Sequence, residues 1–148
     1  MFDVVLYCTE DKNELFDEGD TMANDKVEID VIAPADAVWE VIGDFDACDK
    51  LFPAIEKIVI EDSEAGHDRI ITMFGMDIRE RLISKDDAAR VLTYTVIDLP
   101  NHRGVITVAD QGDSTHVTWD FQVDSDDLLE MLRGTYAQGL EALVTHFA

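Results

Sequence analysis

The spacing of apolar residues divides most of the chain into short segments with a period of two, followed by one long segment with a period near four. Val27, Ile29 and Val31 alternate with acidic residues, which is typical of a strand with one buried face. A run from Pro34 to Gly43 then combines Asp36 and Glu40 with apolar surface from Val38, Trp39, Val41 and Ile42. Proline fits the first turn of a helix and glycine commonly ends one, so this run predicts a short helix.

Six further strands are expected after a second short helix or turn over residues 46–51, which must end before Pro53. Each segment is rich in β-branched and aromatic residues and is bounded by Gly, Pro, Asn or Asp. The expected strands cover residues 55–62, 68–74, 77–85, 90–98, 103–110 and 115–123. Short connections between successive strands indicate an antiparallel meander.

The last segment predicts an amphipathic helix of about 20 residues. Asp124 to Asp127 provide N-capping groups, and apolar residues follow every three to four positions from Leu128 to Phe147. Gly134 and Gly139 within this helix cost about 1 kcal/mol each relative to alanine, so we expect them to permit curvature or a close approach to the sheet. A single sheet with one apolar face needs a cover, which this helix can supply.

Several motifs carry a resemblance to a known family. They are residues 33–45 (APADAVWEVIGDF), Glu80-Arg81-Leu82, Thr118-Trp119, and Tyr136, Gly139-Leu140, Leu143 and Phe147 in the last helix. With the element order, they resemble the SRPBCC superfamily, which includes START domains and the major birch-pollen allergen, and within it the bacterial polyketide cyclase/dehydrase-like proteins. The resemblance covers about residues 27–147 and implies an α+β helix-grip fold. In that fold a curved antiparallel sheet wraps around the C-terminal helix and leaves an internal cavity for an apolar or amphipathic molecule.

Residues on the inward faces of these elements are expected to line the cavity. They are Trp39, Ile71, Met73, Ile78, Glu80, Leu82, Tyr94, Trp119, Tyr136 and Leu140. Glu80 is the most informative of them, because alternation places it between Ile78 and Leu82 on an apolar face. A carboxylate there must be paired, protonated or bound to a ligand. It is either a polar anchor or general acid/base in the cavity, or one half of a structural ion pair with Arg69, Arg79 or another arginine. The remaining alternative is that the strand-face assignment is wrong by one residue.

Tyr94, Tyr136 and His102 are further candidates for polar roles. Each tyrosine lies on an apolar face, where its hydroxyl could orient a ligand or simply find a hydrogen-bond partner in the core. His102 follows Pro100-Asn101 in a loop between two strands, where members of the superfamily often have a gate over the cavity. The alternative for His102 is an exposed loop histidine, which in an acidic protein needs no special role.

Other chemistries find little support in the sequence. Residues 44–55 superficially resemble a calcium loop, but the sixth position is Asp49 instead of glycine and the twelfth is Ile55 instead of glutamate. The four histidines lack metal-binding spacing, and Cys8 and Cys48 are too isolated for a zinc site or a disulfide framework. Phosphate-binding glycine loops, G-x-S-x-G and C-x-x-C are absent from the sequence. We therefore expect no metal and no cofactor.

The net charge of the chain limits which partners it can bind. Its 33 acidic and 11 basic residues give a formal charge of −22, which disfavours binding to nucleic acid or to anionic membranes. Aspartate outnumbers glutamate by 22 to 11, which fits either an ordinary soluble surface or adaptation to high salt. Melting curves against KCl would separate these two interpretations.

The charge is also uneven along the chain. Residues 1–21 hold seven acids and one lysine, so we expect a flexible acidic extension followed by one domain over residues 22–148. We find no signal peptide and no apolar stretch long enough to cross a bilayer. The expectation is a cytoplasmic protein, monomeric or a weak homodimer.

Three functions are compatible with these observations. The first is a module that binds a small hydrophobic or amphipathic ligand in the internal cavity. The second is a cyclase- or dehydratase-type enzyme in which Glu80 transfers a proton and a tyrosine or His102 polarises a carbonyl. The third is an acidic assembly or chaperone-like module that binds a basic partner.

Overall fold

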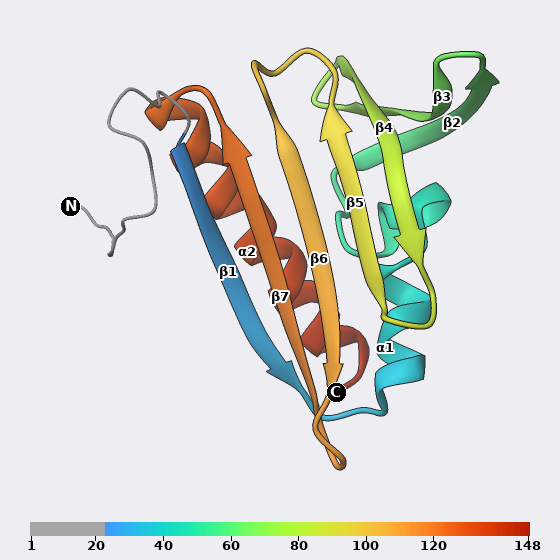
Figure 1. Ribbon diagram of the computed structural model, residues 1–148, viewed down its shortest axis with the longest axis vertical. Helices are drawn as coiled ribbons and strands as arrows, with labels where there is room; N and C mark the ends of the chain where they lie inside the picture. Colours follow the sequence, from blue (N-terminus) through green and yellow to red (C-terminus); the bar gives the residue numbers. More distant parts are fainter. Residues whose placement is uncertain (1–22) are drawn as a thin grey trace.

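The computed structural model describes residues 23–148, and the predicted acidic extension over residues 1–21 lies outside the described residues (Figure 1). The elements follow the predicted order. They are β1 (Ala23–Val31), α1 (Ala35–Ile42), the 3-10 helix η1 (Phe45–Lys50), β2 (Ile55–Ser63), β3 (Gly66–Met73), β4 (Met76–Asp86), β5 (Val91–Val96), β6 (Arg103–Asp110), β7 (Thr115–Val123) and α2 (Asp126–His146). Most boundaries differ from the predicted ones by one or two residues. The first strand is the largest difference, because it begins at Ala23 instead of Val27.

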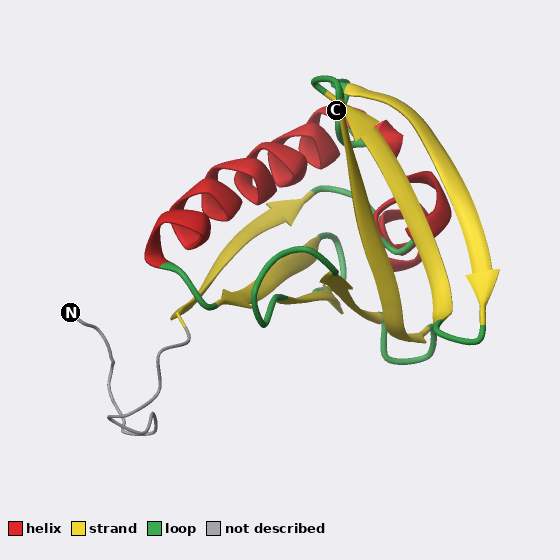
Figure 2. Ribbon diagram, turned by 90° about the horizontal axis from the view of Figure 1, so that it is seen from above, coloured by secondary structure: helices red, strands yellow, loops and turns green. Residues whose placement is uncertain are grey.

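All seven strands form one antiparallel sheet in the order β1-β7-β6-β5-β4-β3-β2. The first strand pairs with the last, so that Val27 of β1 faces Trp119 of β7. Figure 2 shows that the sheet is strongly curved and that α2 lies across its concave side. This arrangement confirms the predicted α+β helix-grip fold.

Local sequence explains where the two α-helices begin and end. Pro34 precedes α1 in an extended conformation, and the Gly43 N–H donates to the Trp39 carbonyl where the helix ends. At the start of α2 the Ser125 side chain accepts a hydrogen bond from the Leu128 N–H at 3.2 Å. This cap satisfies one of the free N–H groups of the first turn. None of the helices in residues 23–148 is long and apolar enough to cross a membrane.

The core lies between the concave face of the sheet and the two helices. In β5 the inward residues Leu92, Tyr94 and Val96 are buried, as is Thr93 on the other face, and the inward residues of β7 are buried as well. From the other side, α2 buries Leu132, Tyr136, Leu140 and Leu143 against this face. The apolar area that is removed from water in this way is the main source of stability.

The two glycines of α2 have different surroundings. A Cβ atom at Gly139 would lie 2.6 Å from Cζ of Phe52 and 3.3 Å from Cζ3 of Trp119. A Cβ atom at Gly134 would meet no atom within 4 Å. The predicted close approach of the helix to its neighbours is therefore confirmed at Gly139 and does not apply to Gly134.

Candidate ligand-binding pocket

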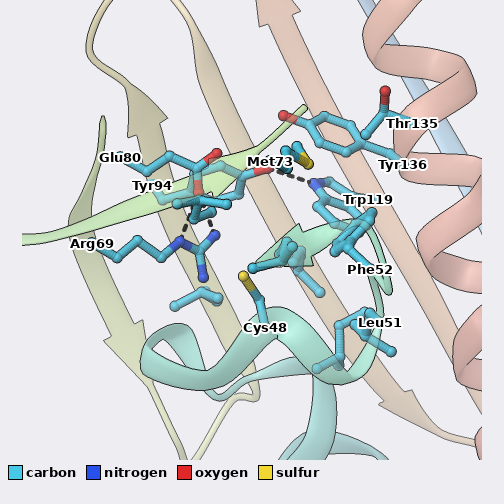
Figure 3. A pocket seen from close by; sticks show the side chains of 15 residues that line it. Cys48, Leu51, Phe52, Arg69, Met73, Glu80, Tyr94, Trp119, Thr135 and Tyr136 are labelled. Carbon is cyan, nitrogen blue, oxygen red and sulfur yellow. Dashed lines mark hydrogen bonds and ion pairs between the residues drawn. The ribbon is translucent and has the colours of Figure 1, made fainter. Parts of the chain in front are cut away.

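A pocket lies between the sheet, the segment around η1 and the middle of α2 (Figure 3). It encloses about 530 Å³ of space free of protein atoms, counting its open mouth. Most of its lining is apolar or aromatic, with a small polar group on one wall. The lining residues are Ile42, Cys48, Leu51, Phe52, Ile55, Arg69, Ile71, Met73, Glu80, Leu92, Tyr94, Ile106, Trp119, Thr135 and Tyr136.

The structure brings six of the ten expected cavity residues to this pocket. They are Ile71, Met73, Glu80, Tyr94, Trp119 and Tyr136. Ile78 and Leu82 share the inward face of β4 with Glu80 but do not line the pocket, and neither do Trp39 and Leu140. The inward face of β4 extends beyond the pocket at both ends, so Glu80 is the one β4 residue in the pocket lining. Trp39 is held elsewhere, because its Nε1–H donates to Oδ1 of Asp87 at 2.9 Å.

Arg69 and Glu80 form a buried ion pair on the pocket wall. They are direct partners in the β3–β4 ladder. Arg69 Nε and one terminal nitrogen lie 2.7 and 2.5 Å from the same Glu80 oxygen, Oε1. The other terminal nitrogen donates to the Phe45 carbonyl at 2.6 Å, and the guanidinium lies 4.1 Å from the centre of the Phe45 ring. Among the predicted interpretations of Glu80, the structure therefore contains the ion pair, and this pair lies at the pocket.

The two arginines of β4, Arg79 and Arg81, form ion pairs on the opposite face of the sheet. Asp68 is paired with Arg81 across the ladder, and its carboxylate accepts from Arg81 at 2.7 and 2.9 Å and from Arg79 at 2.8 Å. The hydrogen bonds from Arg81 are the main reason why the pKa of Asp68 falls to about 2. Two adjacent rungs of one hairpin thus carry ion pairs of opposite polarity on opposite faces.

Tyr94 lies at the centre of the pocket wall with its ring fully buried. Its ladder partner on β6 is Gly104, where a Cβ atom would lie 2.6 Å from the ring. Glycine at this position therefore lets the ring lie flat over the neighbouring strand. The Tyr94 hydroxyl accepts a hydrogen bond from Nε1–H of Trp119 at 3.1 Å, and burial raises the pKa of Tyr94 well above its usual value.

Tyr136 of α2 completes this aromatic group. Its ring stacks on Trp119, with the ring centres 4.2 Å apart and the planes inclined by 12°. Burial raises the pKa of Tyr136, and the nearby Glu80 carboxylate raises it further. Tyr136 is fixed at its polar end by a hydrogen bond between its hydroxyl and Nε2 of His102 at 3.0 Å.

The alternative of an exposed His102 is wrong. The side chain is buried, with 5% of the residue exposed, although it does lie in the loop before β6. Its Nδ1 accepts a hydrogen bond from the Val96 N–H at 2.9 Å, and burial lowers the pKa of His102 to about 4. His102 does not line the pocket but lies behind Tyr136, so it reaches the pocket only through that hydroxyl.

Sequence reasoning did not place several lining residues. Cys48, Leu51 and Phe52 come from η1 and the irregular segment after it, where no periodicity indicates a face. Thr135 lines the pocket beside Tyr136 but carries no apolar signal. Burial raises the pKa of the Cys48 thiol to about 11, with Arg69 opposing this change, so Cys48 is an inert thiol near neutral pH.

We find no candidate metal-binding site in the part of the chain that the structure describes. Within residues 23–148, no group of three or more His, Cys, Asp or Glu side chains is arranged to hold a metal ion. His67 and His116 each lie between two carboxylates, but both rings serve as ion-pair partners on the surface. The titratable groups of the pocket lining are Arg69, Glu80, the two tyrosines and the Cys48 thiol.

The comparison with protein families agrees with this geometry. Residues 22–148 match the family described as polyketide cyclase/dehydrase and lipid transport. The chain belongs to this family. The family description joins cyclisation or dehydration with lipid transport. No curated protein matches the sequence.

Several solved structures resemble this member of the family. XoxI from Bacillus cereus is 25% identical over 84% of this chain and 95% of its own, with a TM-score of 0.73. A protein from Thermobifida fusca is 28% identical over 86% of this chain and 93% of its own, with a TM-score of 0.69. A protein from Nitrosospira multiformis is 20% identical and has a TM-score of 0.74 over 85% of this chain and 97% of its own, which shows the fold alone.

Proposed function

We propose that this protein binds a small, largely apolar molecule in the pocket between the curved sheet and α2. The observation that carries the proposal is the pocket itself, which combines an apolar and aromatic lining with one polar wall. Small-molecule sites are typically lined in this way, with apolar side chains that supply burial and a few polar groups that fix orientation. The family match supports binding of this kind.

The polar wall supports a ligand with one polar end. Arg69 and Glu80 neutralise each other, so they offer hydrogen-bonding capacity without a net charge. Met73 and Ile55, which are ladder partners near the β3–β4 turn, supply apolar surface to the lining. A molecule with an apolar body and one polar end could meet both kinds of surface.

Binding of the neutral fluorescent probe N-phenyl-1-naphthylamine to the purified protein tests the proposal. Met73→Trp places a large ring in the pocket lining and should weaken binding about tenfold or more, because it fills the space a ligand would use. Met76→Trp is the matched control, because Met76 is exposed on the same hairpin and does not line the pocket. Equal affinity in both variants, or no binding by the wild type, would contradict the proposal.

Native mass spectrometry of freshly purified protein is a second test, because it would show a ligand retained from the cell.

A cyclase- or dehydratase-type reaction is a second candidate, favoured by the position of Glu80 and two phenols on one pocket wall. In such a reaction Glu80 would move a proton and a tyrosine would hydrogen-bond to a carbonyl of the substrate. A short poly-β-ketone thioester is a suitable probe, with loss of water from the cyclised product followed by mass spectrometry. Turnover by the wild type would establish the enzyme, and its loss in Glu80→Gln that circular dichroism shows to be folded would assign the proton transfer to Glu80. Binding without turnover leaves the binding module.

A further inference from the structure

The hydrogen bonds around His102 determine where its proton lies. A backbone N–H can only donate, so Nδ1, which accepts from the Val96 N–H, carries no proton. Because burial keeps the ring neutral at ordinary pH, the single ring proton is on Nε2. Nε2–H therefore donates to the Tyr136 hydroxyl, 3.0 Å away.

The Tyr94 hydroxyl is in the same situation. The indole N–H of Trp119 is a donor only, and it donates to the Tyr94 oxygen at 3.1 Å. Each phenol oxygen thus already accepts a hydrogen bond from a buried N–H, and each phenol still has its own proton to donate. The stacking of Trp119 on Tyr136 holds the two phenols in one aromatic group.

These two protons exceed the acceptors that surround them. The phenols are neighbours, so one hydroxyl can donate to the other, but this leaves one proton over. Within residues 23–148 neither hydroxyl donates to a carbonyl or a carboxylate. A buried donor without an acceptor is costly, about 1–3 kcal/mol, and here it belongs to residues that line a pocket.

We propose that the pocket selects ligands with an uncharged carbonyl oxygen, which accepts this remaining phenol proton, and that His102 is the positioning residue that directs it. A carbonyl oxygen has lone pairs to accept the bond and no proton of its own to place. An anionic ligand is disfavoured, because Arg69 is already neutralised and Glu80 lies close to both phenols. This inference rests on the proposed binding function and adds the chemical class of the ligand.

A pair of probes that differ only in the oxygen tests the inference. 2-Acetylnaphthalene carries a ketone, and 2-ethylnaphthalene has the same ring system and side-chain length without it. We expect calorimetric titration of the full-length protein to show that the ketone binds about three- to tenfold more tightly, which is the value of one hydrogen bond. Tyr136→Phe should reduce this preference, which is measured as the ratio of the two affinities in the same variant, so that a change in packing affects both probes.

Variants of His102 separate positioning from simple packing. His102→Leu removes both hydrogen bonds of the ring, so the ketone preference should fall. His102→Gln keeps an acceptor and a donor at a similar separation and should restore part of that preference. Rescue by glutamine would not follow if His102 only filled space.

Infrared spectroscopy of the wild-type complex provides a readout that does not depend on the folding of variants. The carbonyl stretch of bound ¹³C-labelled 2-acetylnaphthalene should appear at a lower frequency than in hexane, as for a hydrogen-bonded ketone, and should shift back in Tyr136→Phe. Equal binding of both probes, or a hexane-like frequency in the complex, would overturn the inference but not the proposed function. Failure of both probes to bind would overturn both.

Discussion

Arg69 and Glu80 are direct ladder partners in β3 and β4, and their ion pair lies on the pocket wall with 7% and 11% of the side chains exposed. The adjacent rung pairs Asp68 with Arg81 on the other face of the same hairpin. The alternation of a β-strand separates these two pairs, so Glu80 and Asp68 share no arginine. The inner pair is the one that a ligand could meet.

Removal of one partner of the inner pair should strongly destabilise the protein. Glu80→Gln leaves the Arg69 guanidinium buried without a counterion, which costs about 3–5 kcal/mol of unfolding free energy. The double variant Arg69→Met, Glu80→Leu leaves no unpaired charge and should lose less stability than Glu80→Gln alone. Urea unfolding at constant pH measures both values. A double variant less stable than the single one would show that the pair contributes net stability.

The outer pair should control stability in acid. The pKa of Asp68 is lowered to about 2, mainly by its hydrogen bonds from Arg81. A carboxylate with a depressed pKa in the folded state adds stability above its unfolded pKa, near 3.8, and this stability is lost as the pH falls toward 2. Melting temperatures from pH 5 down to pH 2 should therefore fall more steeply for the wild type than for Asp68→Asn. Asp98→Asn, which changes an exposed carboxylate, is the control and should keep the wild-type profile.

His116 should contribute stability with the opposite pH dependence. Its two ring nitrogens lie 2.7 Å from Oδ1 of Asp30 and 2.8 Å from Oε1 of Glu28, and the hydrogen bonds that the ring donates to these carboxylates raise the pKa of His116 above 6.5. This contribution is complete below pH 6.5 and is lost as the pH rises through the raised pKa. His116→Gln should thus destabilise the β1–β7 pairing at about pH 5.5 and much less at about pH 9. Because the groups are partly exposed, molar salt should shrink the difference, and an equal effect at both pH values would contradict the assignment.

The two glycines of α2 provide a matched pair of substitutions. Gly134→Ala adds a methyl group in open space and should raise the unfolding free energy by about 1 kcal/mol, because alanine favours the helix. Gly139→Ala makes the same change where Cβ meets Phe52 at 2.6 Å, so the Phe52 ring must move. Since Phe52 lines the pocket, Gly139→Ala should change probe affinity, whereas Gly134→Ala should not. Stability curves and fluorescence titrations of both variants check this, and identical affinities would show that Phe52 moves without affecting the pocket.

Local patterns predicted much of the framework. The alternation around Glu80 correctly placed it on the inward face of β4, and the four-residue spacing after Asp124 correctly gave the long covering helix. Both patterns depend only on the geometry of a single element, which repeats every two residues in a strand and every 3.6 in a helix. The family resemblance, which rested on these patterns and a few motifs, is confirmed by the match over residues 22–148.

The pocket itself could be predicted only in part. His102 is a polar residue in a loop, and its sequence neighbourhood gives no indication that it is buried behind Tyr136, 34 residues later in the chain. Cys48 and Phe52 lie in an irregular segment that has no period from which a face can be read. Such residues are placed by packing between distant elements, and this packing leaves no local signal in the sequence.

The sequence by itself determined the order of elements, the inward faces of the strands and the presence of one acidic residue on an apolar face. Only the tertiary structure decided which arginine pairs with Glu80 and which inward residues reach the pocket. The physical reason is that side-chain direction is a local property of the backbone, whereas ladder register, sheet curvature and the depth of α2 are set jointly by the whole core. The register of the β3–β4 ladder pairs Glu80 with Arg69. The curvature of the sheet brings together four residues from distant elements, His102, Tyr94, Trp119 and Tyr136.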